Sequence, residues 1–564
     1  MPRQVRPYLG ALLVGTCVAC STPPPEQGAT PAAPPNPWWQ RGVIYQIYPR
    51  SFQDSNGDGI GDLKGITSRL DYLKDLGVDA LWLSPIFPSP MADFGYDVSD
   101  YTNVDPRFGT MADFDALVAA AHARGLRVLL DYVPNHTSNQ HSWFVESRKS
   151  RTNPKRDWYV WRDPGPRGGP PNNWVAVFGG PAWTLDNTTG QYYYHAFLKE
   201  QPDLNWRNAD VQKTMFDVIR FWLGRGVDGF RVDTIWLLLE DDQLRDNPAN
   251  PNFRPDMLPA FALTWTHTAD QPDTHALVKR MRQVFDEFPN RVLVAELLGS
   301  LSRLVSYYGA ACDETQLPFN FQLFDATWEA PKLADLIARY EAALPACAWP
   351  DWVLGNHDQH RVVTRLGPEV ARVATMLLLT LRGTPTIYYG DELGLADAVV
   401  PLAAAQDPLE KQQPGRGLGR DPERSPMPWD ARANAGFTSG RPWLPLVANW
   451  SMVNVSAALA DQDSVLALHR RLLALRRATP ALAVGSYAAL PSPGPILGYT
   501  RRLAGQPTYL VALNFSQSLA EYAPNGIDLT GAVVVGTTRT REGERVVGPL
   551  QLAAHEGVIV RLDR

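Results

Sequence analysis

Features that mark several protein classes are scarce or missing in this sequence. Lys and Arg number 53 against 59 for Asp and Glu, the formal net charge is −6, and no run of basic residues stands out. Nucleic-acid-binding chains carry such basic runs or patches, so we expect no nucleic-acid partner. After residue 20, no segment is long and apolar enough to cross a bilayer as a helix. The sequence therefore argues against nucleic-acid-binding and membrane-spanning proteins.

Cysteine is also rare, with four residues in the whole chain. Two of them lie close to the N-terminus, and only Cys312 and Cys347 remain in the body of the chain. Export from the cytoplasm would permit a disulfide between these two. Nothing in the sequence shows that they approach each other, and two separate buried thiols are an equal alternative. The pairing is therefore open at the level of sequence.

The first residues read as an export signal and not as part of the fold. MPRQVR supplies positive charge, YLGALLVGTCVA is a short apolar run, and small residues precede Cys20. Since VAC resembles the end of a lipobox, we expect residues 1–20 to be a lipoprotein-type signal peptide and Cys20 to be lipidated. Cys17 occupies a position where Leu is commoner, which leaves plain secretion open. Residues 21–37 are Pro-rich and predict an extended tether.

This N-terminal pattern also predicts where the protein resides. We expect an exported bacterial lipoprotein that faces the periplasm or the cell exterior and touches the membrane only through the lipid on Cys20. A soluble periplasmic or secreted protein is the alternative, because the cleavage-site pattern is incomplete.

From Trp38 onward, short apolar segments alternate with amphipathic helical segments. Alternating β and α units favour a parallel sheet, and eight of them favour a closed (β/α)8 TIM barrel over a doubly wound open sheet. The predicted fold class is therefore α/β, with the barrel formed by residues 38–136 and 206–482. The predicted strands are 42–49, 80–87, 127–135, 229–233, 291–297, 317–324, 351–356 and 384–390.

Two parts of the chain depart from this alternation. Residues 137–205 are rich in Gly, Pro, Asn and Trp and are too long for one connecting helix, so they predict a small B domain inserted after the third strand. Residues 483–564 contain short β runs separated by Gly, Pro and Asn, which predict a C-terminal antiparallel β-sandwich. Long excursions also follow the fourth and eighth strands. In a parallel barrel these all lie at one end, where we expect them to enclose a pocket.

Ionisable residues gather at the predicted C-terminal ends of the strands. In GFRVDT, Arg231 and Asp233 project from one face, because side chains alternate along a strand. Taken alone, this pair is equally consistent with a buried ion pair that closes the barrel. However, several buried charges at one end are costly without a purpose, so the set predicts an active site. The other members are Asp97, Asp131, His136, Glu296, His357, Asp358 and Arg361.

The residue types at this end favour the cleavage of glycosidic bonds. No Gly-rich phosphate loop, HExxH motif or Ser/Cys nucleophile motif coincides with it. Glycoside cleavage needs one ionised and one protonated carboxyl group. We expect Arg231 to lower the pKa of Asp233, which suits a nucleophile. Burial and the charge of Asp233 should raise the pKa of Glu296, which suits a general acid. Asp358 would then stabilise the positive charge that develops on the sugar.

The blocks DYVPNH, GFRVD, VAEL and GNHD, in this order, carry a resemblance to a known family. From about Trp38 to the C-terminus, the chain resembles the α-amylase superfamily, glycoside hydrolase family 13, in its α-glucosidase and oligo-1,6-glucosidase branch. PNNWVAVFGGPAW, QYYYHAFLKEQPDLNW and GRDPERSPMPWD are similar to the inserted domain and eighth loop of that branch. The resemblance implies that Asp233 is the nucleophile, Glu296 the acid/base and Asp358 the transition-state stabiliser.

The same resemblance implies how substrate is held. Members of the family retain anomeric configuration through a covalent glucosyl-enzyme intermediate, which agrees with carboxyl groups roughly 5 Å apart. One departure from the motif is His360, which stands where Pro is usual. The residues that match those holding glucose in the innermost subsite are Asp97, His136, Arg231, His357 and Arg361.

Thr234 bears on which linkage is cut. In this branch, the residue after the nucleophile tends to be Val in enzymes that cut α-1,6 bonds and Thr in those that cut α-1,4 bonds. A hydroxyl in place of a methyl beside the leaving-group subsite changes which aglycone orientation is favoured. We therefore expect Thr234 to bind substrate and the enzyme to prefer α-1,4 bonds. A strand-end residue without such a role is the alternative.

The segment DSNGDGIGDL, after the first strand, is an oxygen-rich loop. It resembles the first part of an EF-hand loop, although its twelfth position is Gly65 and not Glu. The superfamily branch has a similar loop that holds a structural cation. We therefore expect a structural Ca²⁺ or Mg²⁺ and no organic cofactor, with a solvated turn as the alternative. The predicted ligands are Asp54, Asn56, Asp58, the carbonyl of Ile60, and Asp62.

Taken together, these features predict a retaining, exo-acting α-glucosidase. Its substrates would be small α-glucosides, chiefly maltose and short malto-oligosaccharides. An α-1,6-glucosidase, or a transglucosylase or isomerase of the trehalose synthase type, would use the same intermediate. A non-catalytic binding subunit on the same fold is a remote alternative, since barrels of this kind can lose their chemistry.

Overall fold

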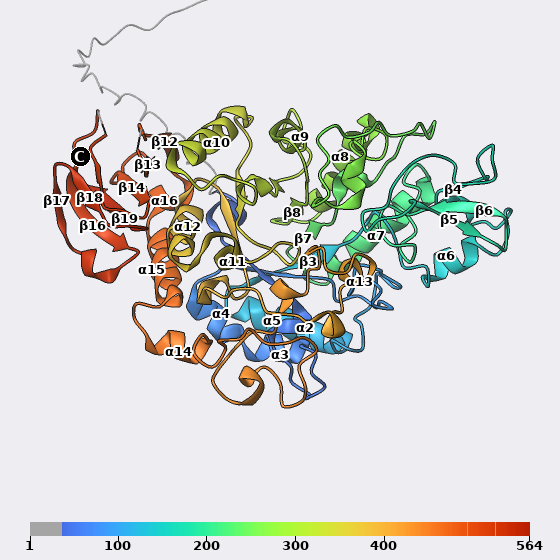
Figure 1. Ribbon diagram of the computed structural model, residues 1–564, viewed down its shortest axis with the longest axis horizontal. Helices are drawn as coiled ribbons and strands as arrows, with labels where there is room; N and C mark the ends of the chain where they lie inside the picture. The colour runs from blue at the N-terminus through green and yellow to red at the C-terminus, as the bar shows by residue number, and fades with distance from the viewer. Residues whose placement is uncertain (1–35, 493, 525, 564) are drawn as a thin grey trace, which may run out of the picture. The chain divides into compact units, whose positions relative to one another are not determined.

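The computed structural model describes residues 36–492, 494–524 and 526–563 (Figure 1). The predicted signal peptide, the lipidation site Cys20 and nearly all of the predicted tether lie outside the described residues, so these remain predictions. None of the helices that the structure describes has the length and apolar character needed to cross a membrane.

Eight parallel strands form the central sheet, in the order β10-β11-β1-β2-β3-β7-β8-β9. Most of their residues are buried, as expected for strands covered on both faces. Every predicted strand segment contains one of these strands, and the (β/α)8 fold is confirmed. The strands are β1 (Ile44–Ile47), β2 (Ala80–Leu83), β3 (Arg127–Tyr132), β7 (Gly229–Val232), β8 (Val292–Ala295), β9 (Leu317–Pro318), β10 (Asp351–Val353) and β11 (Thr384–Tyr388).

Helices connect the strands and cover the sheet. Their starts follow local sequence signals: Thr110 and Asp113 form a capping box, and Asn208 and Ser464 cap later helices. The connecting helices are α3 (Leu63–Ser68), α4 (Leu70–Leu76), α5 (Met111–Ala123), α7 (Ala209–Gly224), α8 (Pro272–Asp286), α9 (Leu301–Ser306), α10 (Ala330–Ala343), α11 (Val362–Leu366), α12 (Pro368–Thr380) and α15 (Val465–Ala478). Shorter helices are α1 (Trp38–Arg41), α2 (Pro49–Phe52), α13 (Pro408–Gln412), α14 (Val455–Ala460) and α16 (Pro480–Val484).

The span predicted as the B domain contains a small antiparallel sheet of its own. It consists of β4 (Trp161–Arg162), β6 (Gln191–Tyr194) and β5 (Trp183–Asp186), in that order, with α6 (Ser142–Ser147) preceding them. Trp174, Trp183 and Tyr194 pack together in its core. An isolated bridge between His136 and Asp203 joins its two ends. The insertion therefore begins and ends beside the C-terminal end of β3.

The C-terminal residues form two antiparallel sheets, as predicted. Apolar residues of both sheets, including Leu510 and Leu552, share one buried cluster. The six-stranded sheet has the order β12-β13-β14-β19-β16-β17, and β15 pairs with β18. Their bounds are β12 (Ser486–Ala489), β13 (Ile496–Arg502), β14 (Tyr509–Asn514), β15 (Ala520–Tyr522), β16 (Thr530–Gly536), β17 (Arg545–Val547), β18 (Leu550–Leu552) and β19 (Gly557–Leu562).

Two details of the barrel bear on the sequence analysis. Cys312 and Cys347 form a disulfide, which answers the question left open by their spacing. At the start of β7, a Cβ on Gly229 would lie 2.2 Å from the carbonyl oxygen of Val292 on the neighbouring strand. Glycine therefore lets β7 and β8 approach closely, directly before the residues that carry the predicted chemistry.

Candidate active site

A cavity of about 300 Å³ lies at the C-terminal ends of the barrel strands. Asp233, Glu296 and Asp358 line it, and they follow β7, β8 and β10 respectively. Parallel strands bring their C-terminal ends to the same side of the sheet, which is why residues so distant in sequence meet here. The structure thus gathers the three predicted catalytic carboxyl groups in one cavity.

The guanidinium of Arg231 joins the buried carboxylates of this site. Its Nη1 lies 2.7 Å from Oδ1 of Asp131 and 2.7 Å from Oδ1 of Asp233, and its Nη2 lies 2.6 Å from Oε2 of Glu296. Arg231 is 1% exposed, so little solvent screens these contacts. One cation therefore fixes the positions of the predicted nucleophile and the predicted acid relative to each other.

Burial raises the pKa of both carboxyl groups in this pair. It raises the pKa of Asp233 to about 7, although Arg231 acts in the opposite direction. It raises the pKa of Glu296 to about 8 against the same guanidinium, and the charges of Asp233 and Asp358 add to the rise. The expectation of a low pKa for Asp233 is therefore wrong, because burial outweighs a guanidinium shared among several carboxylates. The two carboxyl groups share one guanidinium and each raises the pKa of the other in its charged form, so they titrate as a pair.

Asp358 has the opposite electrostatic environment. Its Oδ1 lies 2.7 Å from Nη2 of Arg424 and 3.1 Å from Nη1 of Arg420, and its Oδ2 lies 3.2 Å from Nε2 of His357. Burial opposes ionisation, but the two guanidiniums outweigh it and hold the pKa of Asp358 below its usual range. Asp358 is therefore a fixed negative charge beside Asp233 and Glu296, whose carboxyl groups can gain or lose a proton.

Both predicted histidines belong to buried hydrogen-bond networks around Tyr96. His357 contacts Gln46 through Nδ1 at 2.8 Å and the hydroxyl of Tyr96 through Nε2 at 2.6 Å. His136 lines the cavity and contacts Gln201 at 3.0 Å and the carbonyl of Tyr96 at 3.1 Å. Burial lowers the pKa of His136 to about 3 and lowers that of His357 as well. His136 is therefore neutral at physiological pH, and burial favours the neutral form of His357 too.

Thr234 links the nucleophile to the acid. Its backbone N–H donates to Oε2 of Glu296 at 3.1 Å, and its hydroxyl lies 3.2 Å from Oδ2 of Asp233. Its φ is 39°, a conformation that β-branched residues rarely adopt. This backbone turn directs the Thr234 amide at Glu296, and Thr234 lines the cavity.

The prediction for Asp97 is wrong in its placement. Its carboxylate does not line the cavity and instead accepts hydrogen bonds from the hydroxyl of Ser89 and the backbone amides of Ala92 and Asp93. Asp93 lines the cavity, and its Oδ1 lies 2.7 Å from Nη2 of Arg420. Phe94, between the two aspartates, has a φ of 46°, so the chain turns sharply there. That turn directs one carboxylate into the cavity and the other into the protein.

Arg361 also lies elsewhere than predicted. Its guanidinium is fully buried, donates to the carbonyl of Tyr389 at 2.7 Å and lies 3.6 Å from Asp391. Besides Arg231, the arginines that reach carboxylates of the cavity are Arg420 and Arg424, in the loop after β11. Sequence reasoning missed both as site residues. The signal was present in GRDPER, where two closely spaced arginines follow the last barrel strand.

Three chain segments wall the cavity, as the sequence analysis predicts. The insertion after β3, the excursion after β7 and the excursion after β11 all contribute residues. The indoles of Trp236 and Trp265 stack at 5.0 Å, which makes part of the wall flat and apolar. Such a wall suits the apolar face of a sugar ring. Wall residues from the three segments include Val177, Phe178, Leu258, Phe261, Trp265, Leu409 and Leu418.

The predicted cation loop has a suitable set of donor atoms. Asp54 accepts hydrogen bonds from backbone amides of the loop and from Thr438, and Asp58 accepts from the amide of Ile60. Asp62 caps α3 by accepting from the amide of Gly65. Carboxylates, an amide oxygen and a carbonyl fit a hard cation such as Ca²⁺ or Mg²⁺. In this structure their oxygens serve the turn itself, so the cation stays a prediction.

Comparisons with known proteins agree with this geometry. The family model described as "Alpha amylase, catalytic domain" matches residues 46–485. A "Probable alpha-glucosidase" of Rhizobium meliloti (strain 1021) is 46% identical over 83% of this chain and 88% of its own. An "Oligo-1,6-glucosidase" of Heyndrickxia coagulans is 39% identical over 86% of this chain and 93% of its own. The solved structure of "alpha-glucosyl transfer enzyme, XgtA" is 44% identical, has a TM-score of 0.88, and covers 93% of this chain and 99% of its own.

Proposed function

This chain belongs to the alpha-amylase family and is a glycoside hydrolase, and from that premise we propose that it is a retaining, exo-acting α-glucosidase. It would release terminal α-1,4-linked glucose from maltose and short malto-oligosaccharides. The observation that carries the proposal is the contact of one buried guanidinium, Arg231, with both Asp233 and Glu296 at the cavity. Two carboxyl groups held together at a cavity suit the nucleophile and the acid of a retaining glycoside hydrolase.

In the proposed mechanism, Asp233 attacks the anomeric carbon while Glu296 gives its proton to the departing glycosidic oxygen. The products of this step are a covalent glucosyl-enzyme and a free sugar. Glu296, now ionised, then takes a proton from water, which attacks the same carbon and releases α-glucose and the Asp233 carboxylate. The fixed charge of Asp358 would favour the positive charge that develops on the ring in both steps.

Terminal glucose would be recognised by the polar residues at the inner part of the cavity. Asp93 is held by Arg420, and Gln201 lies beside His136, so these side chains present fixed acceptors and donors. Sugar hydroxyls can form hydrogen bonds with these groups. A ligand without hydroxyls would leave the buried polar groups unpaired, which is costly. This supports recognition of the end of a chain over its interior.

Transglucosylation is the second candidate. It is favoured by the likeness to the "alpha-glucosyl transfer enzyme, XgtA" and by the apolar wall, which could exclude water from the intermediate. Maltose, isomaltose, sucrose, trehalose and maltotriose should be supplied separately and the products followed by NMR. If the protein is a retaining hydrolase, the glucose released from the non-reducing end should initially be the α-anomer, and maltose should be cleaved readily. Longer glucosides as main products would favour transfer, and initial β-glucose would contradict the retaining mechanism.

Thr234→Val is expected to shift preference from maltose towards isomaltose by about tenfold in the ratio of kcat/KM values, because single contacts of this kind discriminate modestly. The change removes the hydroxyl that lies 3.2 Å from Asp233 while keeping the β-branched shape. Thr234→Ser, which keeps the hydroxyl, is the matched control and should retain the preference for maltose. An unchanged ratio in Thr234→Val would remove the argument for α-1,4 preference.

We also propose that the loop from Asp54 to Asp62 binds a structural Ca²⁺ or Mg²⁺. Removal of a cation present at 100 times its Kd would cost about 2.7 kcal/mol, so chelation with EDTA should lower the melting temperature of a chain of this length by about 2 °C. Asp58→Ala removes an exposed carboxylate that is a predicted ligand of the cation. In this variant, EDTA should change the melting temperature little. If EDTA leaves the melting temperature of the wild type unchanged, the loop binds no stabilising cation and is an ordinary turn.

Finally, we propose that the protein is exported and anchored by a lipid on Cys20. The Cys312–Cys347 disulfide supports export, because disulfides persist outside the reducing cytosol. Cys20→Ser should move the protein from the membrane fraction to the soluble fraction of its host. Its persistence in the membrane fraction would show that another feature holds it there.

A further inference from the structure

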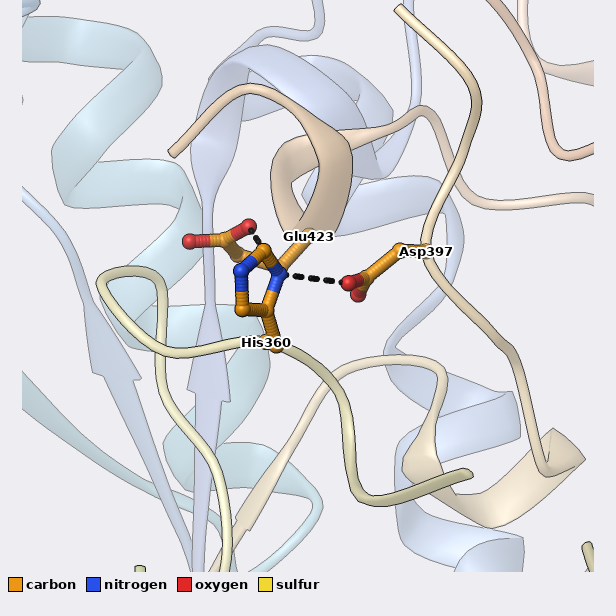
Figure 2. A group of neighbouring side chains, drawn as sticks. All are labelled: His360, Asp397 and Glu423. Carbon is orange, nitrogen blue, oxygen red and sulfur yellow. Dashed lines mark hydrogen bonds and ion pairs between the residues drawn. The ribbon is translucent and has the colours of Figure 1, made fainter. Parts of the chain in front are cut away.

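Three side chains at the edge of the cavity form a compact group of nitrogen and oxygen ligands (Figure 2). Nδ1 of His360 lies 2.6 Å from Oδ2 of Asp397 and 3.8 Å from Oε2 of Glu423. His360 precedes α11, Asp397 follows β11, and Glu423 lies in the single turn Pro422–Arg424. Within the described part of the chain, this is the one group of three or more His, Cys, Asp or Glu whose ligand atoms all lie within 4.8 Å of one another.

The most informative member is Glu423, which is 1% exposed. Its Oε2 is buried and accepts no hydrogen bond from any residue that the structure describes, although it faces the imidazole of His360. A buried carboxylate oxygen without a donor is costly, and such an atom calls for a cation or a proton. Among the ion pairs of the described residues, Glu423 has His360 as its one cationic partner.

Neighbouring arginines make their hydrogen bonds to groups other than these two carboxylates. Arg424 donates to Asp358 and to the carbonyl of His357, and Arg361 donates to the carbonyl of Tyr389. Arg365 donates to the backbone carbonyls of His360, Leu354 and Phe324. Among the ion pairs of the described residues, the two carboxylates therefore share one imidazole, and Arg424, Arg361 and Arg365 attract them only at longer range.

Two ligands of the group are already oriented by the backbone. The amide of Arg361 donates to Oδ1 of Asp397 at 2.9 Å, which turns Oδ2 towards His360. His360 also has a hydrogen bond with the backbone of Gly417. Metal-ligating side chains are commonly fixed by such outer contacts, which hold the ring and the carboxylate in position before an ion binds.

We propose that His360, Asp397 and Glu423 bind a divalent transition-metal ion, with Zn²⁺ the best match. One imidazole and two carboxylates are ligands that Zn²⁺ accepts, and three protein ligands leave a fourth position for water or substrate. A tetrahedral ion with bonds of about 2.0–2.2 Å would separate the ligand atoms by roughly 3.3 Å, so small rotations of these side chains suffice. The all-oxygen loop at Asp54 suits a harder cation and forms a separate site.

The position of the ion gives the site a consequence for catalysis. His360 and Glu423 both line the cavity, and His360 follows Asp358 by two residues. A bound ion would place two positive charges close to Asp358 and narrow the approach to the cavity. We therefore expect Zn²⁺ to inhibit turnover. This consequence rests on the proposed function, whereas binding of the ion does not.

The binding test is isothermal titration calorimetry of the full chain without a polyhistidine tag. The protein is stripped with EDTA, desalted, and titrated with ZnSO4 in excess Ca²⁺, which occupies the Asp54 loop. One equivalent of Zn²⁺ should bind, and His360→Ala and Asp397→Asn should weaken that binding at least tenfold. His275→Ala is the matched control, because His275 pairs with a single carboxylate, Glu314, at 2.8 Å. It should bind Zn²⁺ as the wild type does.

A second measurement uses Co²⁺ in place of Zn²⁺. The wild type should give visible d–d absorption bands, and His360→Gln and Glu423→Gln, which preserve side-chain size, should lose them. Melting curves establish that each variant is folded. Absence of Zn²⁺ binding by the wild type would overturn the proposal, as would equal binding by His360→Ala or equal loss in the His275→Ala control. Because neither readout requires turnover, failure here is distinguishable from failure of the proposed glucosidase activity.

Discussion

Asp233→Asn should abolish turnover while the protein remains folded. The variant cannot form the covalent bond to the anomeric carbon, so kcat should fall by on the order of 10⁴-fold or more, the size of loss seen when a nucleophile is removed. The amide oxygen can still accept from Arg231, which keeps its contacts with Asp131 and Glu296. We therefore expect little change in the cavity's shape. The measurement is steady-state hydrolysis of maltose beside a thermal melt.

A matched control exists at the other end of the same strand. Asp228 precedes β7, pairs with His122 at 2.7 Å and Arg291 at 3.4 Å, and accepts a hydrogen bond from the amide of Val128. Asp228→Asn makes the same chemical change away from the cavity. It should cost stability and leave kcat within a few-fold of the wild type. Near-normal activity of Asp233→Asn, or an equal loss in both variants, would refute the nucleophile assignment.

The barrel could be predicted from sequence because its signals are local. Each strand is a short apolar run with a helical segment after it, and parallel pairing then places every C-terminal end on one side. That topological step brings Asp233, Glu296 and Asp358 to one cavity without any knowledge of their distances. The inference fails only where a side chain's direction depends on a turn and not on strand alternation.

Asp97 and Arg361 show where that limit lies. The sharp turn at Phe94 sends Asp93 into the cavity and Asp97 into the protein, and nothing in ADFGYD distinguishes them. Arg361 follows a barrel strand closely, yet the arginines beside Asp358 are Arg420 and Arg424, which lie 62 and 66 positions after Asp358 in a later loop. Loop arrangements of this kind are set by tertiary packing, so sequence spacing does not reveal them.

The pKa of Asp233 was mispredicted for a related reason. From the sequence, Arg231 has one visible acidic partner; in the structure it contacts three carboxylates that are all buried. A single positive charge divided among them cannot offset their loss of hydration. Burial is the largest cause of the rise in the pKa of Asp233, and neither the burial nor the number of carboxylates on Arg231 can be seen in the sequence.

Glu296→Gln should lower kcat/KM most for substrates whose leaving group needs a proton to depart. For maltose, whose leaving sugar is a poor leaving group, kcat/KM should fall by about 10²–10⁴-fold, the usual contribution of a general acid. For an aryl α-glucoside with an acidic phenol as leaving group, the first step needs no proton and the glucosyl-enzyme should accumulate as a burst. The glutamine oxygen can still accept from Arg231 and the Thr234 amide, so the cavity keeps its shape.

The pH profile provides an independent test of the same assignment. Asp233 must be ionised and Glu296 protonated, so kcat/KM of the wild type should rise through the lower pKa of the pair and fall through the upper one, near 7 and 8. Glu296→Gln should lose the alkaline fall and keep the acid rise. Glu240→Gln is the control, because burial raises the pKa of Glu240 to about 7 but its side chain does not line the cavity. If Glu296→Gln lost equal activity on both substrates and kept its alkaline limb, the proton that leaves with the sugar would have to come from another group.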